Sequence, residues 1–264
     1  MLNTLSIVYT PFSRKWLRRE LRLVLLVGHV LLGIILSLIL FSPLWCSRFP
    51  KHWSSMLVSG WSRTLCRICG LQVQCYGERV TGPTLFVANH ISWLDVFALL
   101  SIFSVIFISK QEVKKWPVVG WLARRVGTLF MRRGQFEASA LASNAVVNSL
   151  FNHSNVLFFP EGTCTDGTYV KRFHARMFQA AIETGVPVQP IALRYPLGSR
   201  VNSVVPFLGD ETFLANLWRI LGEEKLYIEV WFCPPVLAHK KKRRELADYA
   251  QAQVLNVLER YQNY

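Results

Sequence analysis

An uncharged apolar run near the N-terminus sets the first limit on how this chain folds. Residues 23–45 read LVLLVGHVLLGIILSLILFSPLW and contain no Asp, Glu, Lys or Arg. As an α-helix this run would extend about 35 Å, and the hydrocarbon core of a bilayer is about 30 Å thick. The run has no small-residue cleavage site, so we interpret it as a retained membrane-associated helix rather than a signal peptide.

A second candidate membrane segment follows at residues 52–71, HWSSMLVSGWSRTLCRICGL. Its large apolar residues, Trp53 and Trp61 among them, repeat with helical spacing, while serine and arginine occupy most of the other positions. Pro43 and Pro50 favour a bend between the two segments. We therefore expect residues 1–69 to form a helical hairpin that anchors the chain to a membrane. The alternative is that the second helix packs on the domain that follows.

The charge balance narrows the class of protein further. The chain has 30 Lys+Arg against 16 Asp+Glu, a formal net charge of +14, yet it is 52% hydrophobic and only 17% charged. Disordered chains combine low hydrophobicity with dense charge, and soluble nucleic-acid binders have charge-rich surfaces, so neither class fits. The cysteines lack the spacing of a disulfide framework, and Cys66 and Cys69 have no second pair at zinc-site spacing. We therefore expect reduced thiols and no metal site.

After residue 70, short β-like runs alternate with helical ones, a pattern typical of α/β domains. We therefore expect one α/β domain over residues 70–264, with a mixed central sheet flanked by helices. The expected strands lie within residues 71–77, 84–90, 104–110, 127–131, 155–162, 186–193 and 225–232. The expected helices lie near residues 93–100, 112–126, 136–151, 173–184 and 211–221.

Candidate catalytic residues cluster where the run TLFVANH meets ISWLDVFALL. His90 and Asp95 lie five residues apart across this strand-to-helix junction, where a carboxylate can orient the imidazole as a general base. Ser92 is a poor nucleophile candidate because it lies only two residues after His90, so we expect the substrate to supply the nucleophile. The structural alternative is that Asn89, Ser92 and Asp95 only cap the helix.

These residues and three later blocks resemble the glycerolipid (lysophospholipid) acyltransferase family. Asn89-His90-x-Ser92-x-x-Asp95 is similar to the first block of that family, and the other three follow in the family's order. They are Gly127-x-x-Phe130-x-x-Arg133, Phe159-Pro160-Glu161-Gly162-Thr163 and Val186-Pro187-Val188-Gln189-Pro190. The resemblance covers about residues 70–200 and implies an acyltransferase catalytic domain over residues 70–264.

The resemblance also implies a role for each block. It makes His90 and Asp95 the catalytic pair and places a binding site for the acyl acceptor at the first three blocks. The substrate-binding residues that it implies are Asn89, Ser92, Gly127, Phe130, Arg133, Glu161, Gly162 and Thr163. Arg133 offers the fork-shaped donors that suit an anionic head group. The resemblance implies neither a metal nor a bound cofactor.

Two positions depart from the common family pattern and bear on the acceptor. The third block usually continues from Gly-Thr to Arg or Ser, but this chain has Cys164 there. The Lys that often follows a Pro-Phe pair is His174. Fewer cations are therefore available to bind a phosphate. The sequence still predicts 1-acyl-sn-glycerol-3-phosphate as the acceptor, giving phosphatidate, with lyso-ornithine lipid as the alternative.

The expected reaction moves a fatty acyl group from acyl-CoA or acyl carrier protein to the free hydroxyl of a lysolipid. The expected partners are this acceptor, one of these donors and membrane lipids, with no nucleic acid. Both donors are cytoplasmic, so we expect the catalytic domain to face the cytoplasm at the inner membrane. Five basic residues before the apolar run against three after it are too few to decide the orientation. A non-catalytic membrane lipid-binding protein is the competing class, but it leaves the spacing of His90 and Asp95 unexplained.

Overall fold

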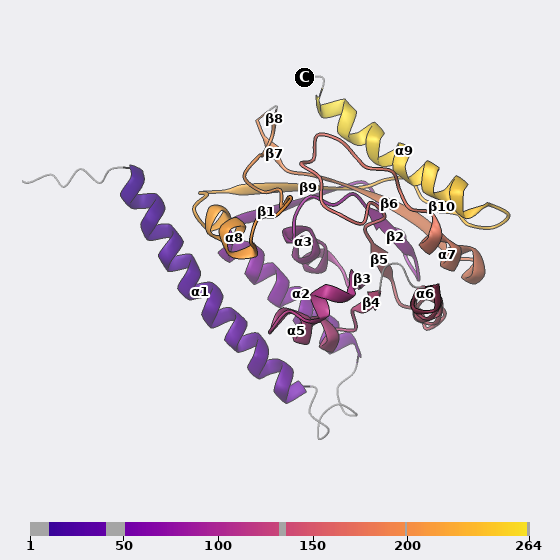
Figure 1. The fold of residues 1–264 in the computed structure, drawn as a ribbon, viewed down its shortest axis with the longest axis horizontal. Coiled ribbons are helices and arrows are strands. Elements are labelled where there is room, and N and C mark those ends of the chain that lie inside the picture. Colours follow the sequence, from indigo (N-terminus) through magenta and orange to yellow (C-terminus); the bar gives the residue numbers. More distant parts are fainter. Residues whose placement is uncertain (1–10, 41–50, 132–135, 199, 263–264) are drawn as a thin grey trace, which may run out of the picture.

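The computed structural model describes residues 11–40, 51–131, 136–198 and 200–262. It has the predicted α/β architecture, a mixed sheet flanked by helices, preceded by two N-terminal helices (Figure 1). Within the described residues, the main sheet consists of β1 (Leu71–Tyr76), β2 (Leu85–Ala88), β3 (Ile106–Lys110), β4 (Leu129–Met131), β5 (Val156–Phe158), β6 (Pro187–Arg194), β9 (Leu226–Phe232) and β10 (Val236–Leu237). A separate small ribbon pairs β7 (Pro196–Leu197) with β8 (Arg200–Val201).

The order of the strands brings the carboxyl ends of five parallel strands to one edge of the sheet. The order is β1-β9-β6-β2-β5-β3-β4, and β10 pairs with β6. Strands β6, β2, β5, β3 and β4 are mutually parallel, whereas β9 runs antiparallel to β6. The carboxyl ends of the parallel strands therefore point the same way, and ligands of open α/β sheets bind at that edge.

Helices cover both faces of this sheet. They are α1 (Pro11–Leu40), α2 (Lys51–Ile68), α3 (Leu94–Ile102), α4 (Gln111–Lys114), α5 (Val119–Arg125), α6 (Phe136–Phe151), the 3-10 helix η1 (Arg176–Phe178), α7 (Gln179–Thr184), α8 (Phe213–Leu221) and α9 (Arg243–Gln262). A hydrophobic core lies on each face of the sheet, because successive side chains along a strand point to opposite faces. On β2, Phe86 and Ala88 face α2, α3 and α8, while Leu85 and Val87 face α6, α7 and α9. All four of these side chains are buried.

The predicted strand positions are confirmed, but two predicted helices are shorter than expected. The helix expected near residues 112–126 is interrupted between α4 and α5, where Pro117 lacks a backbone N–H and Val118 has φ +63°. The helix expected from residue 173 begins only at Arg176, because the N–H of His174 instead binds the carbonyl of Pro160 at 3.0 Å. It ends at Gly185, which has φ +73°.

Helix α2 packs on the domain that follows, which was the alternative interpretation of this segment. Leu65, Cys66 and Cys69 join the core beneath α3 and β1, and burial raises the pKa of both thiols to about 12. The indole of Trp61 stacks on His29 of α1 at 4.6 Å rather than lying on an outer face. The predicted bend at residues 43–50 and the Trp53 side chain lie outside the described residues.

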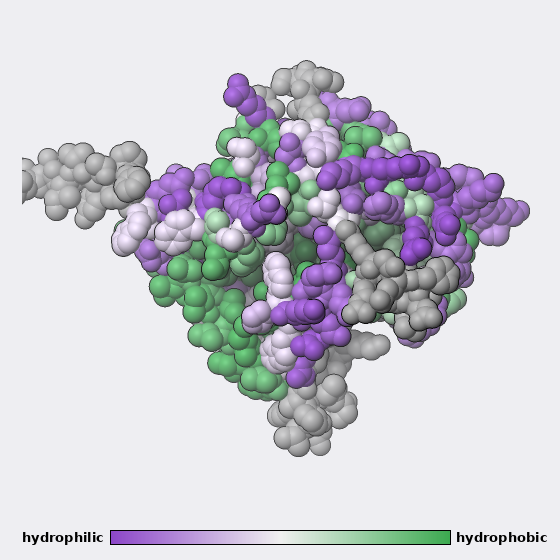
Figure 2. Space-filling model, in the orientation of Figure 1, coloured by the Kyte–Doolittle hydropathy of each residue, from purple (hydrophilic) through white to green (hydrophobic). Residues whose placement is uncertain are grey.

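Helix α1 lies along the domain and is attached to it at its basic end. Arg18 donates to the carbonyl of Gly222 at 2.8 Å, and Arg22 donates to the carbonyls of Leu221, Glu223 and Glu224 at the end of α8. Cations are favoured there, because the carbonyls at the C-terminus of a helix carry partial negative charge. Within the described residues, one helix is long and apolar enough to cross a membrane, over Arg14–Ile39. Its outer surface forms a broad hydrophobic area in Figure 2.

Candidate active site

The predicted catalytic segment lies at the carboxyl edge of the parallel strands. His90 follows β2, Glu161 follows β5 and Tyr195 follows β6, so three neighbouring strands each contribute a polar side chain to one place. Asn89 fixes the end of β2 to β6, because its amide donates to the carbonyl of Leu193 at 2.9 Å and accepts from its N–H at 2.7 Å. This side chain is buried and positions the junction from which His90 projects.

His90 and Asp95 form a hydrogen-bonded pair. His90 Nδ1 lies 2.8 Å from Asp95 Oδ2, which assigns the proton of the neutral ring to Nδ1 and leaves the other ring nitrogen able to accept one. Asp95 is fully buried, while the His90 side chain remains 20% exposed. The ring of Phe159 stacks on the imidazole at 3.9 Å. The structure thus holds the imidazole in a fixed orientation at the surface of the domain.

Asp95 also shapes the loop that carries His90. Its Oδ2 accepts the backbone N–H groups of Ile91 at 2.8 Å and Ser92 at 3.0 Å, while Oδ1 accepts the Tyr195 hydroxyl at 2.6 Å. Tyr195 is fully buried, and both burial and the neighbouring carboxylate raise its pKa well above 10.0, so it remains a hydroxyl donor at physiological pH. The sequence did not single out Tyr195. The one sign of it in the sequence is a side chain with a hydroxyl group directly after an apolar strand.

Glu161 braces the same loop from the other side. Its Oε1 accepts the backbone N–H of His90 at 2.8 Å, and its Oε2 accepts the N–H of Lys171 at 2.7 Å. The side chain is 4% exposed, and burial raises its pKa. These bonds show that Glu161 supports the loop, and its contact with the acceptor stays a prediction.

The remaining predicted binding residues are distributed unequally around His90. Gly162 and Thr163 follow Glu161 on the loop after β5, while Ser92 is buried beside Asp95. Gly127 and Phe130 belong to the loop before β4 and to β4 itself, which lies at the sheet edge with β5 and β3 between it and β2. Gly127 has φ +84°, which favours glycine. Arg133 lies outside the described residues.

Three influences act on the protonation of His90. Burial disfavours the charged imidazolium, but hydrogen bonding to Asp95 and to the Cys164 side chain outweighs burial. The pKa of His90 is therefore raised above its ordinary value of 6.5. A raised pKa makes the imidazole a stronger proton acceptor, but it also reduces the neutral fraction that can act as a base at a given pH.

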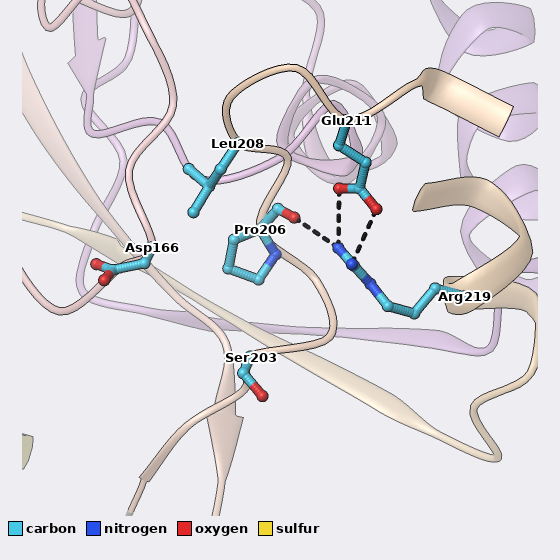
Figure 3. A pocket seen from close by; sticks show the side chains of 6 residues that line it. All are labelled: Asp166, Ser203, Pro206, Leu208, Glu211 and Arg219. Atoms are coloured by element: carbon cyan, nitrogen blue, oxygen red, sulfur yellow. Dashed lines mark hydrogen bonds and ion pairs between the residues drawn. The ribbon is translucent and has the colours of Figure 1, made fainter. Parts of the chain in front are cut away.

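A cavity of about 500 Å³ lies beside the catalytic loop. Figure 3 shows Asp166 across it from the Glu211–Arg219 ion pair, with Pro206 between them. Two backbone hydrogen bonds join its walls to the catalytic loop: Thr165 N–H to the His90 carbonyl at 2.8 Å, and Phe207 N–H to the Ile91 carbonyl at 3.0 Å. These two bonds place the cavity next to the loop that carries His90.

The chain belongs to the acyltransferase family, because the family model matches residues 72–194 and a relative of 37% identity matches over nearly its whole length. It is an acyltransferase. It is 37% identical over 245 residues to a lyso-ornithine lipid O-acyltransferase of Pseudomonas aeruginosa, covering 90% of this chain and 92% of that one. It is 35% identical over 190 residues to a 1-acyl-sn-glycerol-3-phosphate acyltransferase of Neisseria gonorrhoeae, covering 72% and 74%.

A solved structure confirms the fold. The crystal structure of the 1-acyl-sn-glycerophosphate (LPA) acyltransferase PlsC from Thermotoga maritima superposes with a TM-score of 0.69 at 18% identity. The match covers 97% of this chain and 99% of that chain, so it extends to the N-terminal helices. The predicted α/β fold with its mixed sheet is therefore confirmed.

The pKa of His90 predicts the pH dependence of transfer. A general base must be neutral, so kcat/KM should rise with pH, and the midpoint of this rise should lie above 6.5. Asp95→Asn removes a carboxylate that raises this pKa and should therefore move the rise to lower pH while lowering its plateau. Profiles of kcat/KM over about pH 5 to 10 for both proteins test this. An unshifted rise in Asp95→Asn would contradict the role given to Asp95.

Proposed function

We propose that this protein transfers a fatty acyl group from acyl-CoA or acyl carrier protein to the free hydroxyl of a lysolipid at the membrane. The observation that carries this proposal is the His90–Asp95 pair, with Nδ1 bonded to a buried carboxylate and the ring partly exposed. This arrangement suits a general base whose nucleophile comes from the substrate. Ser92 is buried and its N–H binds Asp95, which supports the expectation that it is not the nucleophile.

The reaction needs one base and no acyl-enzyme. His90 takes the proton of the acceptor hydroxyl as its oxygen attacks the thioester carbonyl, and Asp95 stabilises the imidazolium that forms. The tetrahedral intermediate then collapses, the carbon–sulfur bond breaks, and the imidazolium returns a proton to the thiolate. The products are an ester and a free thiol. The N–H groups of His90, Ile91 and Ser92 already bind carboxylates, so we assign none of them to the oxyanion.

Release of free thiol from acyl-CoA distinguishes the classes of function. Thiol release that depends on added lysolipid identifies acyl transfer, release without lysolipid identifies thioester hydrolysis, and no release identifies a binding protein. We expect the first result, and we expect His90→Ala to lower kcat/KM by at least about 100-fold. Thermal unfolding of the variant should match the wild type. A folded His90→Ala protein that keeps more than about a tenth of the rate would contradict the proposal.

The cavity supports a proposal for the acceptor. We expected 1-acyl-sn-glycerol-3-phosphate, with lyso-ornithine lipid as the alternative, and the cavity residues favour the alternative. Glu211 and Arg219 neutralise each other at 2.8 Å, so Asp166 leaves the lining with net negative charge. Such a lining favours an amino group over a phosphate. The Pseudomonas aeruginosa relative, matched over 92% of its length, carries the name of the same alternative.

Removing the charge of Asp166 tests this preference. Asp166→Asn should lower kcat/KM for lyso-ornithine lipid by about 10- to 150-fold, the loss expected for one charge-assisted hydrogen bond, and should not lower it for 1-acyl-sn-glycerol-3-phosphate. Glu183→Gln is a matched control, because Glu183 is an exposed acid on α7, on the other face of the sheet. Equal losses for both acceptors would contradict a head-group role for Asp166.

We also propose that the protein sits on one leaflet of the inner membrane with its catalytic domain in the cytoplasm. In support, α1 contacts the domain from Arg18 at one end to the buried Ser37 at the other, rather than projecting as a free span. The five basic residues before the apolar run therefore say little about orientation, because Arg18 and Arg22 bind carbonyls of this same chain. A cytoplasmic domain can reach acyl-CoA and acyl carrier protein.

A further inference from the structure

The exposed apolar side chains of this protein are not confined to α1. On α1 they form one long face: Leu17, Leu21, Val24, Leu25, Val27, Leu31, Leu32, Ile35, Leu38 and Ile39. Helix α1 packs against both α5 and α8, and these neighbours carry exposed apolar side chains of their own. Leu214 on α8 is 72% exposed. Trp116 and Val118 between α4 and α5, with Val119 at the start of α5, are 37–38% exposed.

Side-chain contacts join these residues to α1 on one side and to the catalytic loop on the other. The guanidinium of Arg19 lies over the ring of Trp218 on α8 at 5.3 Å. Phe213, which precedes Leu214, contacts Trp116 at 5.9 Å and Trp93 at 5.2 Å between ring centres. Trp93 belongs to the catalytic loop, and its indole N–H donates to the buried Asn216 of α8 at 2.9 Å.

The chemistry of this surface matches the boundary between lipid head groups and hydrocarbon. Tryptophan is enriched at that boundary, because its ring is apolar and its N–H is polar. Lys114 and Lys115 directly precede Trp116, and basic residues at this level attract anionic head groups. Leu214 lies four residues before Trp218 on α8, so both belong to the side of the helix that lies near α1.

We propose that Leu214 and Trp116 form a second membrane contact, which inserts into the same leaflet as α1 and seats the catalytic loop at the lipid surface. This inference rests on the proposed function, in which α1 is the membrane anchor. The second contact places the row Trp116–Phe213–Trp93 between the bilayer and His90, so that a lysolipid can present its hydroxyl without leaving the leaflet. We call Leu214 and Trp116, with Val118 and Val119, the rim surface.

The chain offers a matched control for this surface. Leu237 on β10 is 68% exposed, close to the value for Leu214, but it lies at the opposite end of the molecule from α1 (Figure 1). Leu31, at 54% exposed, reports on the face of α1 itself. Leucines at three sites can therefore be compared. Position 214 reports on insertion of the rim surface, position 31 on anchoring by α1, and position 237 on general adsorption to the membrane.

Depth-dependent fluorescence quenching tests the proposal on the full-length protein. Leu31→Cys, Leu214→Cys and Leu237→Cys are each labelled with nitrobenzoxadiazole in a background with Cys46→Ser and Cys75→Ser. The unsubstituted background, labelled in parallel, corrects for reaction at the other thiols. The proteins are reconstituted into vesicles of phosphatidylethanolamine and phosphatidylglycerol, with and without lipids that carry a nitroxide on the acyl chain.

We expect quenching at positions 31 and 214 to exceed that at position 237 by at least about twofold. Quenching at 31 without quenching at 214 would overturn the second contact and leave α1 as the anchor. Equal quenching at 214 and 237 would overturn it as well. No quenching at 31 would contradict the proposed anchoring itself, so failure of the inference and failure of the proposed function give different results.

Discussion

The buried carboxylate of Asp95 is the group on which the rest of this site depends. It accepts four hydrogen bonds, from the His90 ring, the Tyr195 hydroxyl and the backbone N–H groups of Ile91 and Ser92. A buried carboxylate is stable only when its oxygens are paired, so the loop must close around it. The same bonds that satisfy Asp95 therefore fix the conformation of the loop and the orientation of the general base.

The fold supplies the partners that this carboxylate needs. Parallel pairing of β5, β2 and β6 brings Glu161, His90 and Tyr195 to one edge, although they come from distant parts of the chain. Helix α8 links the catalytic loop to α1. Its Asn216 binds Trp93 of the loop, and the carbonyls at its C-terminal end bind Arg18 and Arg22 of α1. One set of contacts thus connects the apolar helix with the catalytic loop.

The sequence predicted what is local along the chain. The strands are short apolar runs, and His90 and Asp95 lie within one strand-to-helix junction, so pattern and spacing were enough to find them. Tyr195 was missed because its partner is 100 residues away and a buried tyrosine resembles an ordinary core residue. The role of the basic residues in the first half of α1 was also missed, because the carbonyls at the end of α8 that Arg18 and Arg22 bind lie about 200 residues further along the chain. The helix expected near residues 112–126 contains Pro117, which has no backbone N–H, and the structure breaks there into α4 and α5.

The central claim is that Asp95 acts through His90, and a double-mutant cycle on kcat/KM tests it most directly. The cycle compares His90→Ala, Asp95→Asn and the protein that carries both changes, with thermal unfolding of each as a control. If Asp95 acts only through the base, the double variant should match His90→Ala within about twofold. The opposite result is that the two losses in kcat/KM multiply. Asp95→Asn would then lower kcat/KM by the same factor in the His90→Ala protein as in the wild type, and this would contradict the claim.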